Sequence, residues 1–194
     1  MDQVAEKESC LILRKGIFLI ADPRLKDPNF SQTVILLCEH NDQGSLGVVV
    51  NRPTLLKVAE AIPNIKALSS TSNVIYSGGP VQTHQVMTLC RTTEQIPDSK
   101  YVGDGMYLGG TLQALEDMLS SKASGTSIRA YMGYAGWSSN QLESELEESS
   151  WKVVPANQKF VFDIEPSEVW PTLLATLGKE YGIYKTMPRD PSMN

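Results

Sequence analysis

The segment between residues 133 and 151 constrains the fold more than any other part of the chain. It joins a strand pattern, a glycine turn, a helix and a second strand. Gly133 and Gly136 flank the predicted turn, since glycine adopts positive φ without steric cost. Ser138 stands three residues before Gln141, which is the spacing of a capping box. The pattern therefore predicts a helix that begins just after the turn.

This predicted helix has one apolar face. Leu142 and Leu146 lie one turn apart and share that face, while glutamates at positions 143, 145, 147 and 148 occupy the others. We therefore predict a short helix held by the docking of two leucines, with an acidic side in water. Trp151 follows at the start of an apolar strand pattern.

Length and composition indicate a globular protein. The chain has 194 residues, of which 41% are hydrophobic and 20% charged, which is enough for one domain with a sizeable core. We predict a single domain over residues 1–194, with flexible ends at 1–8 and 187–194. The apolar runs are far shorter than the ~20 residues of a membrane span. The start of the chain also lacks a secretory signal pattern, so we expect a cytoplasmic protein.

The charge and the cysteine pattern exclude some classes of function. A net charge of −5 opposes direct binding to nucleic acid, whose affinity comes from Lys and Arg that neutralise phosphates. The cysteines at positions 10, 38 and 90 are odd in number and widely spaced, so they form neither a disulfide framework nor a zinc motif. We predict no cofactor and no metal.

Strand and helix patterns mix along the chain without strict alternation. This order favours an α+β fold with a mixed, strongly bent sheet over a doubly wound parallel sheet. Two local predictions matter for the fold. Residues 55–62 are predicted to form a short helix, and residues 151–154 are predicted to pair in a hairpin with residues 160–164.

Asn51 and Arg52 form the most suggestive polar pair. Arg52 leaves a buried strand, and the following proline restrains its backbone. A guanidinium in that position could clamp a carboxylate or a phosphate, because its planar fork matches both groups. The alternative is an internal salt bridge to an aspartate or a glutamate.

A second candidate is the turn formed by Gly78, Gly79 and Pro80. It follows a strand, as phosphate-binding loops do, but it lacks the lysine of a P-loop and the GxGxxG pattern. The sequence therefore favours a tight turn that lets two backbone segments approach closely.

Other polar and aromatic residues also have two interpretations. Trp137 is a partner anchor if it is exposed beside Gly136, and otherwise a core aromatic. Cys38 and His40 lie two residues apart and could form a catalytic pair, although a buried cysteine and a surface histidine are the simpler interpretation. His40 with Asp42 and His84 matches no established metal-ligand spacing.

Several motifs together resemble one bacterial family. They are the segment from Gly16 to Ala21, the Asp27-Pro28-Asn29-Phe30 turn, the segment from Gly47 to Pro53, Gly78-Gly79-Pro80, Gly133-Tyr134-Ala135-Gly136-Trp137, Gln141-Leu142-Glu143, Glu145-Leu146, Trp151 and Trp170. With them, the chain is similar to the YqgE/AlgH family over nearly its whole length, from Gly16 to Gly178. One departure is the Ser138-Ser139-Asn140 segment, where the family usually carries glycine, which argues against a flexible glycine loop there.

The resemblance implies an α+β fold with a bent or bifurcated sheet surrounded by helices. It implies no reaction, because the family has no established one. One branch of the family is named as a regulator of alginate synthesis and is often labelled a transcriptional regulator. No helix-turn-helix pattern is present here, so we expect any effect on transcription to pass through another protein.

Our main hypothesis is a cytoplasmic binding or regulatory module, without an enzyme activity, for an unknown protein or small-molecule ligand. Its site would combine the turns of Asn51, Arg52, Gly78, Gly79, Pro80, Gly136 and Trp137 with the nearby Gln141 and Glu145. The alternative is an enzyme of unknown reaction, with Arg52 as anion clamp and His40 or Glu145 as acid–base group. Direct DNA binding, a third hypothesis, requires a contiguous basic face.

Overall fold

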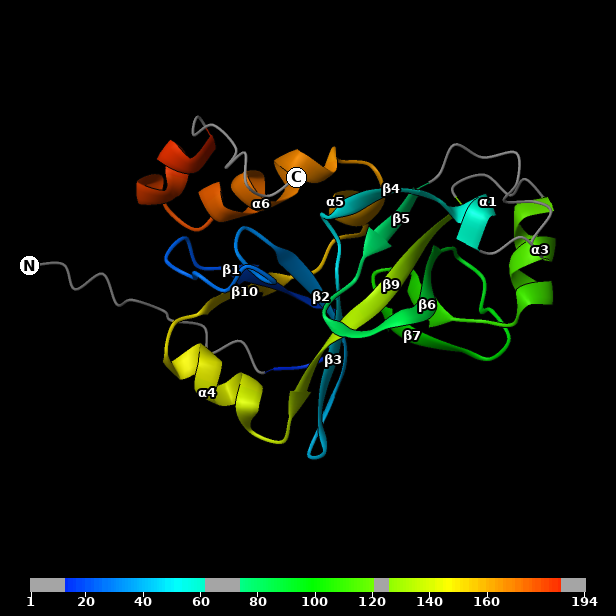
Figure 1. Ribbon diagram of the computed structural model, residues 1–194, viewed down its shortest axis with the longest axis horizontal. Helices are drawn as coiled ribbons and strands as arrows, with labels where there is room; N and C mark the ends of the chain where they lie inside the picture. Colours follow the sequence, from blue (N-terminus) through cyan, green and yellow to red (C-terminus); the bar gives the residue numbers. More distant parts are fainter. Residues whose placement is uncertain (1–12, 62–73, 121–125, 186–194) are drawn as a thin grey trace, which may run out of the picture.

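The computed structural model describes residues 13–61, 74–120 and 126–185, and their central element is one curled β-sheet (Figure 1). The strands are β1 (Ile17–Ala21), β2 (Val34–Asn41), β3 (Gly44–Val49), β4 (Pro53–Lys57), β5 (Val74–Ser77), β6 (Val81–Arg91), β7 (Ser99–Gly103), β8 (Met106–Gly109), β9 (Ser127–Ser138) and β10 (Trp151–Pro155). The helices are α1 (Val58–Ala61), α3 (Leu112–Ser120), α4 (Gln141–Glu147), α5 (Gln158–Phe162) and α6 (Pro166–Ala175), followed by the 3-10 helix η1 (Lys179–Lys185).

The sheet is mixed and forks on β9. Its main path runs β10-β1-β2-β3-β9-β6-β8-β7, and every neighbouring pair on this path is antiparallel. β5 pairs parallel with β9 at residues 131–132, which pair with β6 on the other edge. β3 uses the same edge as β5 farther along, at residues 135–138. The expectation of an α+β fold with a bent sheet is therefore confirmed in its broad form, and β5 adds one parallel pairing to the antiparallel ones.

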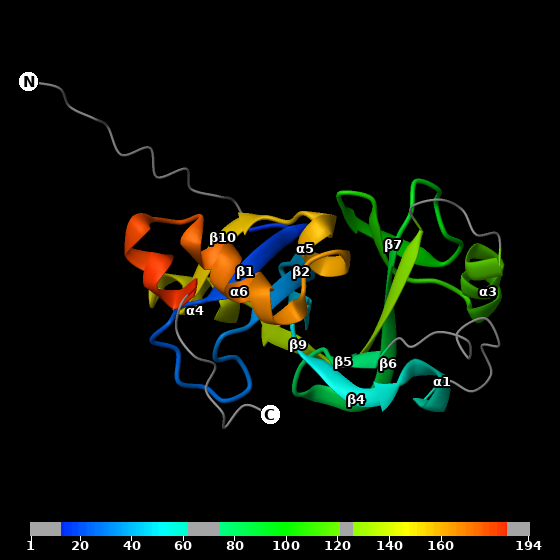
Figure 2. The ribbon, with the colours of Figure 1, turned by 90° about the horizontal axis from the view of Figure 1, so that it is seen from above.

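The curl brings β7, at one end of the path, back to residues 15 and 16, which precede β1. A Cβ atom added at Gly16 would lie 2.8 Å from the Val102 carbonyl oxygen of β7. Lys15 Nζ also donates to the Tyr101 carbonyl oxygen over 2.8 Å. The sheet therefore forms a half-barrel, and Figure 2 shows its two halves side by side.

β1 is buried on both faces, which explains its uninterrupted apolar sequence. Phe18 and Ile20 pack into the larger core with Trp170 of α6. Leu19 and its neighbours on the opposite face pack with Leu142 of α4. In Figure 1, α6 and α4 lie on opposite sides of β1 and β10. The molecule is mostly sheet, with helices over parts of it, so "surrounded by helices" is more than the structure shows.

Two local predictions are wrong. Residues 53–57 form the edge strand β4 because they pair with β5, and within the described part of the predicted helix Val58–Ala61 is helical. Residues 158–162 form α5 instead of a strand, because the Asn157 side chain accepts a hydrogen bond from Lys159 N and caps a helix. β10 pairs with β1, so the predicted hairpin is also wrong.

The predicted glycine turn at 133–136 is wrong too, because β9 continues through it to Ser138. Gly133 has φ +70, but β3 pairs with the residues that follow and keeps them extended. The helix begins at Gln141 after Asn140, so Ser138 is not its cap. Docking of the helix through Leu142 is confirmed.

The single domain over residues 1–194 stays a prediction, and both predicted flexible ends lie outside the described residues. Within 13–61, 74–120 and 126–185, no helix is long and apolar enough to cross a membrane.

Candidate functional site

The Glu145 side chain joins two strands to α4. Its Oε2 atom accepts hydrogen bonds from the indole nitrogens of Trp137 at 2.9 Å and Trp151 at 2.7 Å. Its Oε1 atom accepts a bond from Gln141 Nε2 at 3.0 Å, and Gln141 Oε1 in turn accepts the backbone N–H of Ser138 at 3.1 Å. The predicted site residues Trp137, Gln141 and Glu145 are therefore brought together, with the carboxylate held by three donors.

Trp137 itself is a core residue. Its side chain is only 6% exposed, and Phe30 stacks on it with ring centroids 6.5 Å apart. Phe30 and Trp137 also lie edge-on to Trp151, at 5.6 and 6.2 Å. The indole ring is therefore not available as an exposed partner anchor.

Arg52 binds backbone carbonyls of the turn at residues 28–31. Its Nη1 donates to the Asn29 carbonyl oxygen at 2.7 Å, and its Nη2 donates to those of Pro28 and Ser31 at 3.1 and 3.0 Å. Burial lowers the pKa of the guanidinium. The alternative of an internal salt bridge is wrong, because the partners are carbonyls. The guanidinium group, which could have clamped an anion, instead holds the turn that places Phe30 against Trp137 and Trp151.

Asn51 has a similar role beside it. Its Oδ1 accepts the backbone N–H of Val34 at 2.9 Å, and its Nδ2 donates to the Gln32 carbonyl oxygen at 3.0 Å. These two bonds connect the end of β3 to the start of β2, so the amide side chain takes the place of a backbone amide in the pairing of the two strands.

Gly78 and Gly79 allow a close backbone approach, as the sequence favoured. Gly78 N donates to the Met132 carbonyl oxygen at 2.8 Å, and its own oxygen accepts Val49 N at 2.9 Å. A Cβ atom added at Gly78 would overlap the carbonyl oxygen of Gly133, and one added at Gly79 would overlap the backbone of Tyr134. This turn therefore links the end of β3 to β9 through backbone hydrogen bonds. Pro80, which follows it, is exposed.

The three predicted segments form a row of contacts. Ser77 N donates to the Arg52 carbonyl oxygen at 2.8 Å, which joins the first segment to the second. Gly79 lies against Tyr134 of β9. Arg52 and Trp137 lie toward opposite ends of β3, however, since Trp137 pairs with Ser45. The three segments therefore lie one after another along the direction of the strands. Most of their polar side chains form hydrogen bonds within the protein.

An open groove of about 440 Å³ lies at one end of this row. It is lined by residues from the β2–β3 hairpin, the start of β6 and the end of β9, including Glu39, Asn41, Leu46, Val81, Tyr134 and Gly136. Gly136 and Trp137 are the predicted site residues that line it. The others were missed, although the Asn41-Asp42-Gln43-Gly44 hairpin signal marks the loop that forms one wall.

The remaining candidates for chemistry are separated or buried. Burial raises the pKa of the Cys38 thiol to about 12, and its Sγ contacts the Leu36 carbonyl oxygen at 3.4 Å. His40 Nδ1 instead hydrogen-bonds to Ser45 Oγ at 2.8 Å, and its Nε2 lies 3.8 Å from Glu143. A thiol held neutral by burial is not a nucleophile at neutral pH, so the structure favours the simpler interpretation of Cys38 as a buried core residue. The described ranges contain no group of three His, Cys, Asp or Glu side chains placed to hold a metal.

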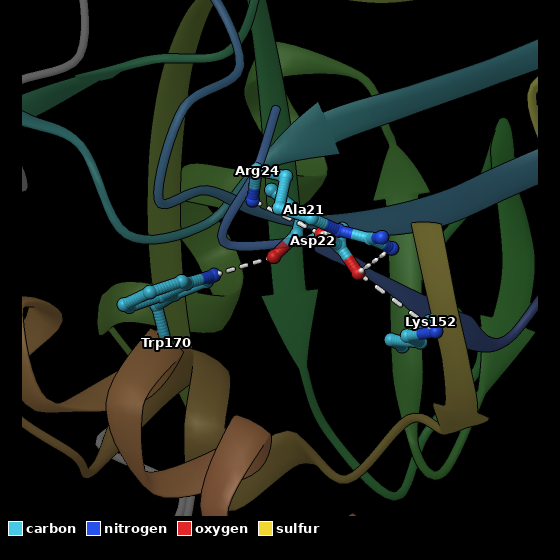
Figure 3. A network of polar contacts seen from close by, with 5 residues as sticks. All are labelled: Ala21, Asp22, Arg24, Lys152 and Trp170. Atoms are coloured by element: carbon cyan, nitrogen blue, oxygen red, sulfur yellow. Dashed lines mark hydrogen bonds and ion pairs between the residues drawn. The ribbon is translucent and has the colours of Figure 1, made fainter. Parts of the chain in front are cut away.

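A second polar network fixes the end of β1 (Figure 3). Asp22 is 4% exposed, and its carboxylate accepts Arg24 Nε at 2.8 Å and lies 3.8 Å from Lys152 Nζ. Trp170 Nε1 donates to the carbonyl oxygen of the preceding Ala21 at 2.9 Å. These contacts connect β1 to β10 and α6, away from the groove residues, and we assign them a structural role.

Comparison with known proteins gives consistent matches. The model of a family described as AlgH-like (DUF179) matches residues 18–182. A UPF0301 protein of Chlorobaculum tepidum is 38% identical over 186 residues, which cover 94% of this chain and 97% of the relative. A UPF0301 protein of Chlamydia caviae is 34% identical over 183 residues, covering 94% and 96%.

Two solved structures have the same fold. The solution structure of the AlgH protein from Pseudomonas aeruginosa has a TM-score of 0.70 and 31% identity, and the match covers 98% of this chain and all of that one (100%). A crystal structure of a Corynebacterium diphtheriae protein has a TM-score of 0.78 at 23% identity, covering 90% and 93%.

Proposed function

The chain belongs to the AlgH-like family, and from this premise and the geometry of the groove we propose that it is a cytoplasmic binding module without an enzyme activity. The groove at the end of β9 is its docking site. The observation that supports this proposal is the position of the groove. It opens at Gly136, an exposed glycine near the place where β2 and β9 end and β3 begins.

The alternative, an enzyme, has less support. Arg52, Glu145 and His40 each bond to neighbours within the protein, and only Glu145 lies in the tryptophan cluster. A general acid–base group has to reach a substrate atom, and none of these three groups lines the groove. An effect on transcription, if the protein has one, would pass through the molecule that docks in the groove.

The proposal is tested by filling the groove. Gln43 lines the groove and is exposed, so Gln43→Trp places a large ring there at little cost to folding. Gln113→Trp is the matched control, because Gln113 is exposed on α3, at the far end of the molecule in Figure 1. Binders are first selected with the unmodified protein from a metabolite collection and from a library of random octapeptides.

We expect binders that shift the backbone amide resonances of Leu46, Val81 and Gly136. Their affinity should fall at least tenfold in Gln43→Trp and stay unchanged in Gln113→Trp. Binders that shift other resonances and bind Gln43→Trp normally would contradict the groove as the docking site, and so would two selections that yield no binder.

A further inference from the structure

One edge of β9 is open at the groove. β3 pairs with residues 135–138 of β9 on one side. On the other side, β6 pairs with β9 only as far as the contact of Val81 with Tyr134. Within the described ranges, no strand pairs with β9 beyond Tyr134 on that side. β9 therefore has a short free edge, and free edges accept an additional strand.

The backbone groups of Gly136 point toward this free edge. A Cβ atom added at Gly44 would overlap the Trp137 carbonyl oxygen, so that oxygen points toward β3. In an antiparallel ladder, the backbone groups of successive residues point to alternate edges. Ser138, which has the same orientation as Gly136, confirms this pattern, because its N–H bonds to Gln141 Oε1 instead of to β3. The N–H and C=O of Gly136 are thus left for a partner.

The surface next to this edge suits an extended peptide. Gly136 is exposed and has no side chain, so a second backbone can approach it closely. Leu46, Val81 and Tyr134 give the groove an apolar wall beside it. A strand that adds to an edge gains affinity from main-chain hydrogen bonds and specificity from the pockets beneath alternate side chains.

The charge at the groove selects the class of partner. Glu39 lines the groove, and Lys100 is its ion-pair partner. Glu143 lies close by on α4, where its carboxylate is 3.8 Å from His40. The whole chain carries a net charge of −5. A peptide with lysine or arginine at alternate positions can replace Lys100 as the partner of Glu39.

We propose that the occupant of the groove is an extended, basic segment of a partner protein that adds to β9 as a short strand paired with Gly136. This inference rests on the proposed function, because it assigns an occupant to the same groove. A second copy of this chain is disfavoured as the occupant, because it would bring its own negative charge.

The test uses peptides selected from a random octapeptide library against the whole protein. The selected peptides should be enriched in lysine, arginine and β-branched residues. N-methylation of a central peptide residue removes a backbone donor and leaves the side chains unchanged, so it should weaken binding at least tenfold. Selected peptides that are acidic, or that tolerate N-methylation at every position, would overturn the proposal.

Two pairs of protein variants complete the test. Gly136→Pro removes the outward N–H, whereas Gly136→Ala keeps it and also adds a Cβ atom, so only the proline variant should lose at least tenfold in affinity. Glu39→Gln should weaken binding, and Lys100→Gln should strengthen it by freeing Glu39. Melting temperatures show whether each variant is folded. Equal affinities of the two Gly136 variants would overturn strand addition.

The outcomes separate this proposal from the proposed function. Peptides that lose affinity in Gln43→Trp, but bind Gly136→Pro as well as Gly136→Ala, leave the groove as the docking site and overturn strand addition. Peptides that bind Gln43→Trp normally overturn both. A dimer of the chain in sedimentation experiments that disappears only in Gly136→Pro would assign the edge to a second copy and overturn the proposed partner.

Discussion

Trp137 and Trp151 donate their indole N–H groups to the same oxygen atom, Oε2 of Glu145. The two tryptophans come from β9 and β10, which do not pair with each other in the sheet. One carboxylate on α4 therefore links strands at separate positions of the sheet, and the edge-on contact of the two rings completes the link. The relationship explains how a short helix with glutamates on its exposed side is held against the sheet.

Glu145→Ala should lower the free energy of unfolding by about 2 kcal/mol, because it leaves two mostly buried indole donors without an acceptor. The matched control is Glu147→Ala, an exposed glutamate on the same helix, which should change stability by less than about 0.5 kcal/mol. Urea unfolding followed by tryptophan fluorescence measures both. Equal stability of the two variants would show that the shared acceptor contributes nothing.

Asp22→Asn should be destabilised by about 2 kcal/mol at pH 7, the magnitude of a hydrogen bond to a charged group. The hydrogen bonds from Arg24 keep the pKa of Asp22 below its ordinary value of 3.8, against the opposing effect of burial. The contribution of Asp22 is therefore present above pH 3.8 and is lost as the pH falls through the lower folded-state pKa. Unfolding measured against pH should show the gap between the two proteins narrowing below pH 4. A gap that is constant down to pH 2 would contradict the ionic role of this network.

Arg52→Lys should lower stability by about 1–3 kcal/mol, because an ammonium group cannot reach the three carbonyl oxygens that the guanidinium fork contacts. It should also change tryptophan emission in the folded state, since the turn held by Arg52 carries Phe30 against Trp137. Lys26→Ala, in the same segment and exposed, is the control. Emission and melting temperature that match this control would show that the turn does not depend on Arg52.

Gly78→Ala should be among the most damaging small substitutions, with a loss of about 3 kcal/mol or more, because its Cβ atom would overlap backbone that cannot move aside. Gly182→Ala is the matched control, since nothing lies within 4 Å of the Cβ position there. Melting temperatures of the two purified variants decide the question. A Gly78→Ala protein as stable as Gly182→Ala would mean that the backbone of β9 can move away from residue 78 at little cost.

The parts of the fold that depend on local pattern were predictable from sequence. The apolar run of β1 predicts a strand, and Leu142 with Leu146 predicts a docked helix. The path of β9 was not predictable in this way. The glycines at 133 and 136 favour a turn locally, but the pairing partner that keeps the segment extended is β3, more than eighty residues earlier in the chain.

The candidate site shows the same limit. The type of residue at Arg52 was informative, but its partners are main-chain oxygens, and a sequence does not show which carbonyls lie in reach of a side chain. The groove was also out of reach, since its walls come from separate strands that only the folded sheet brings together. Residues 160–164 were predicted as a strand because a short apolar run fits a strand and a helix equally, and the Asn157 cap places residues 158–162 in a helix.

The pairing of β1 with β10 has a consequence for synthesis of the chain in the cell. Ile17 faces Pro155 across the sheet, so the first strand lacks one of its two neighbours until residue 155 has left the ribosome. At about 5–20 residues per second, this wait lasts on the order of ten seconds. During that time the apolar segment Ile17–Ala21 lacks its pairing with β10. Exposed apolar segments of nascent chains are the surfaces that chaperones bind.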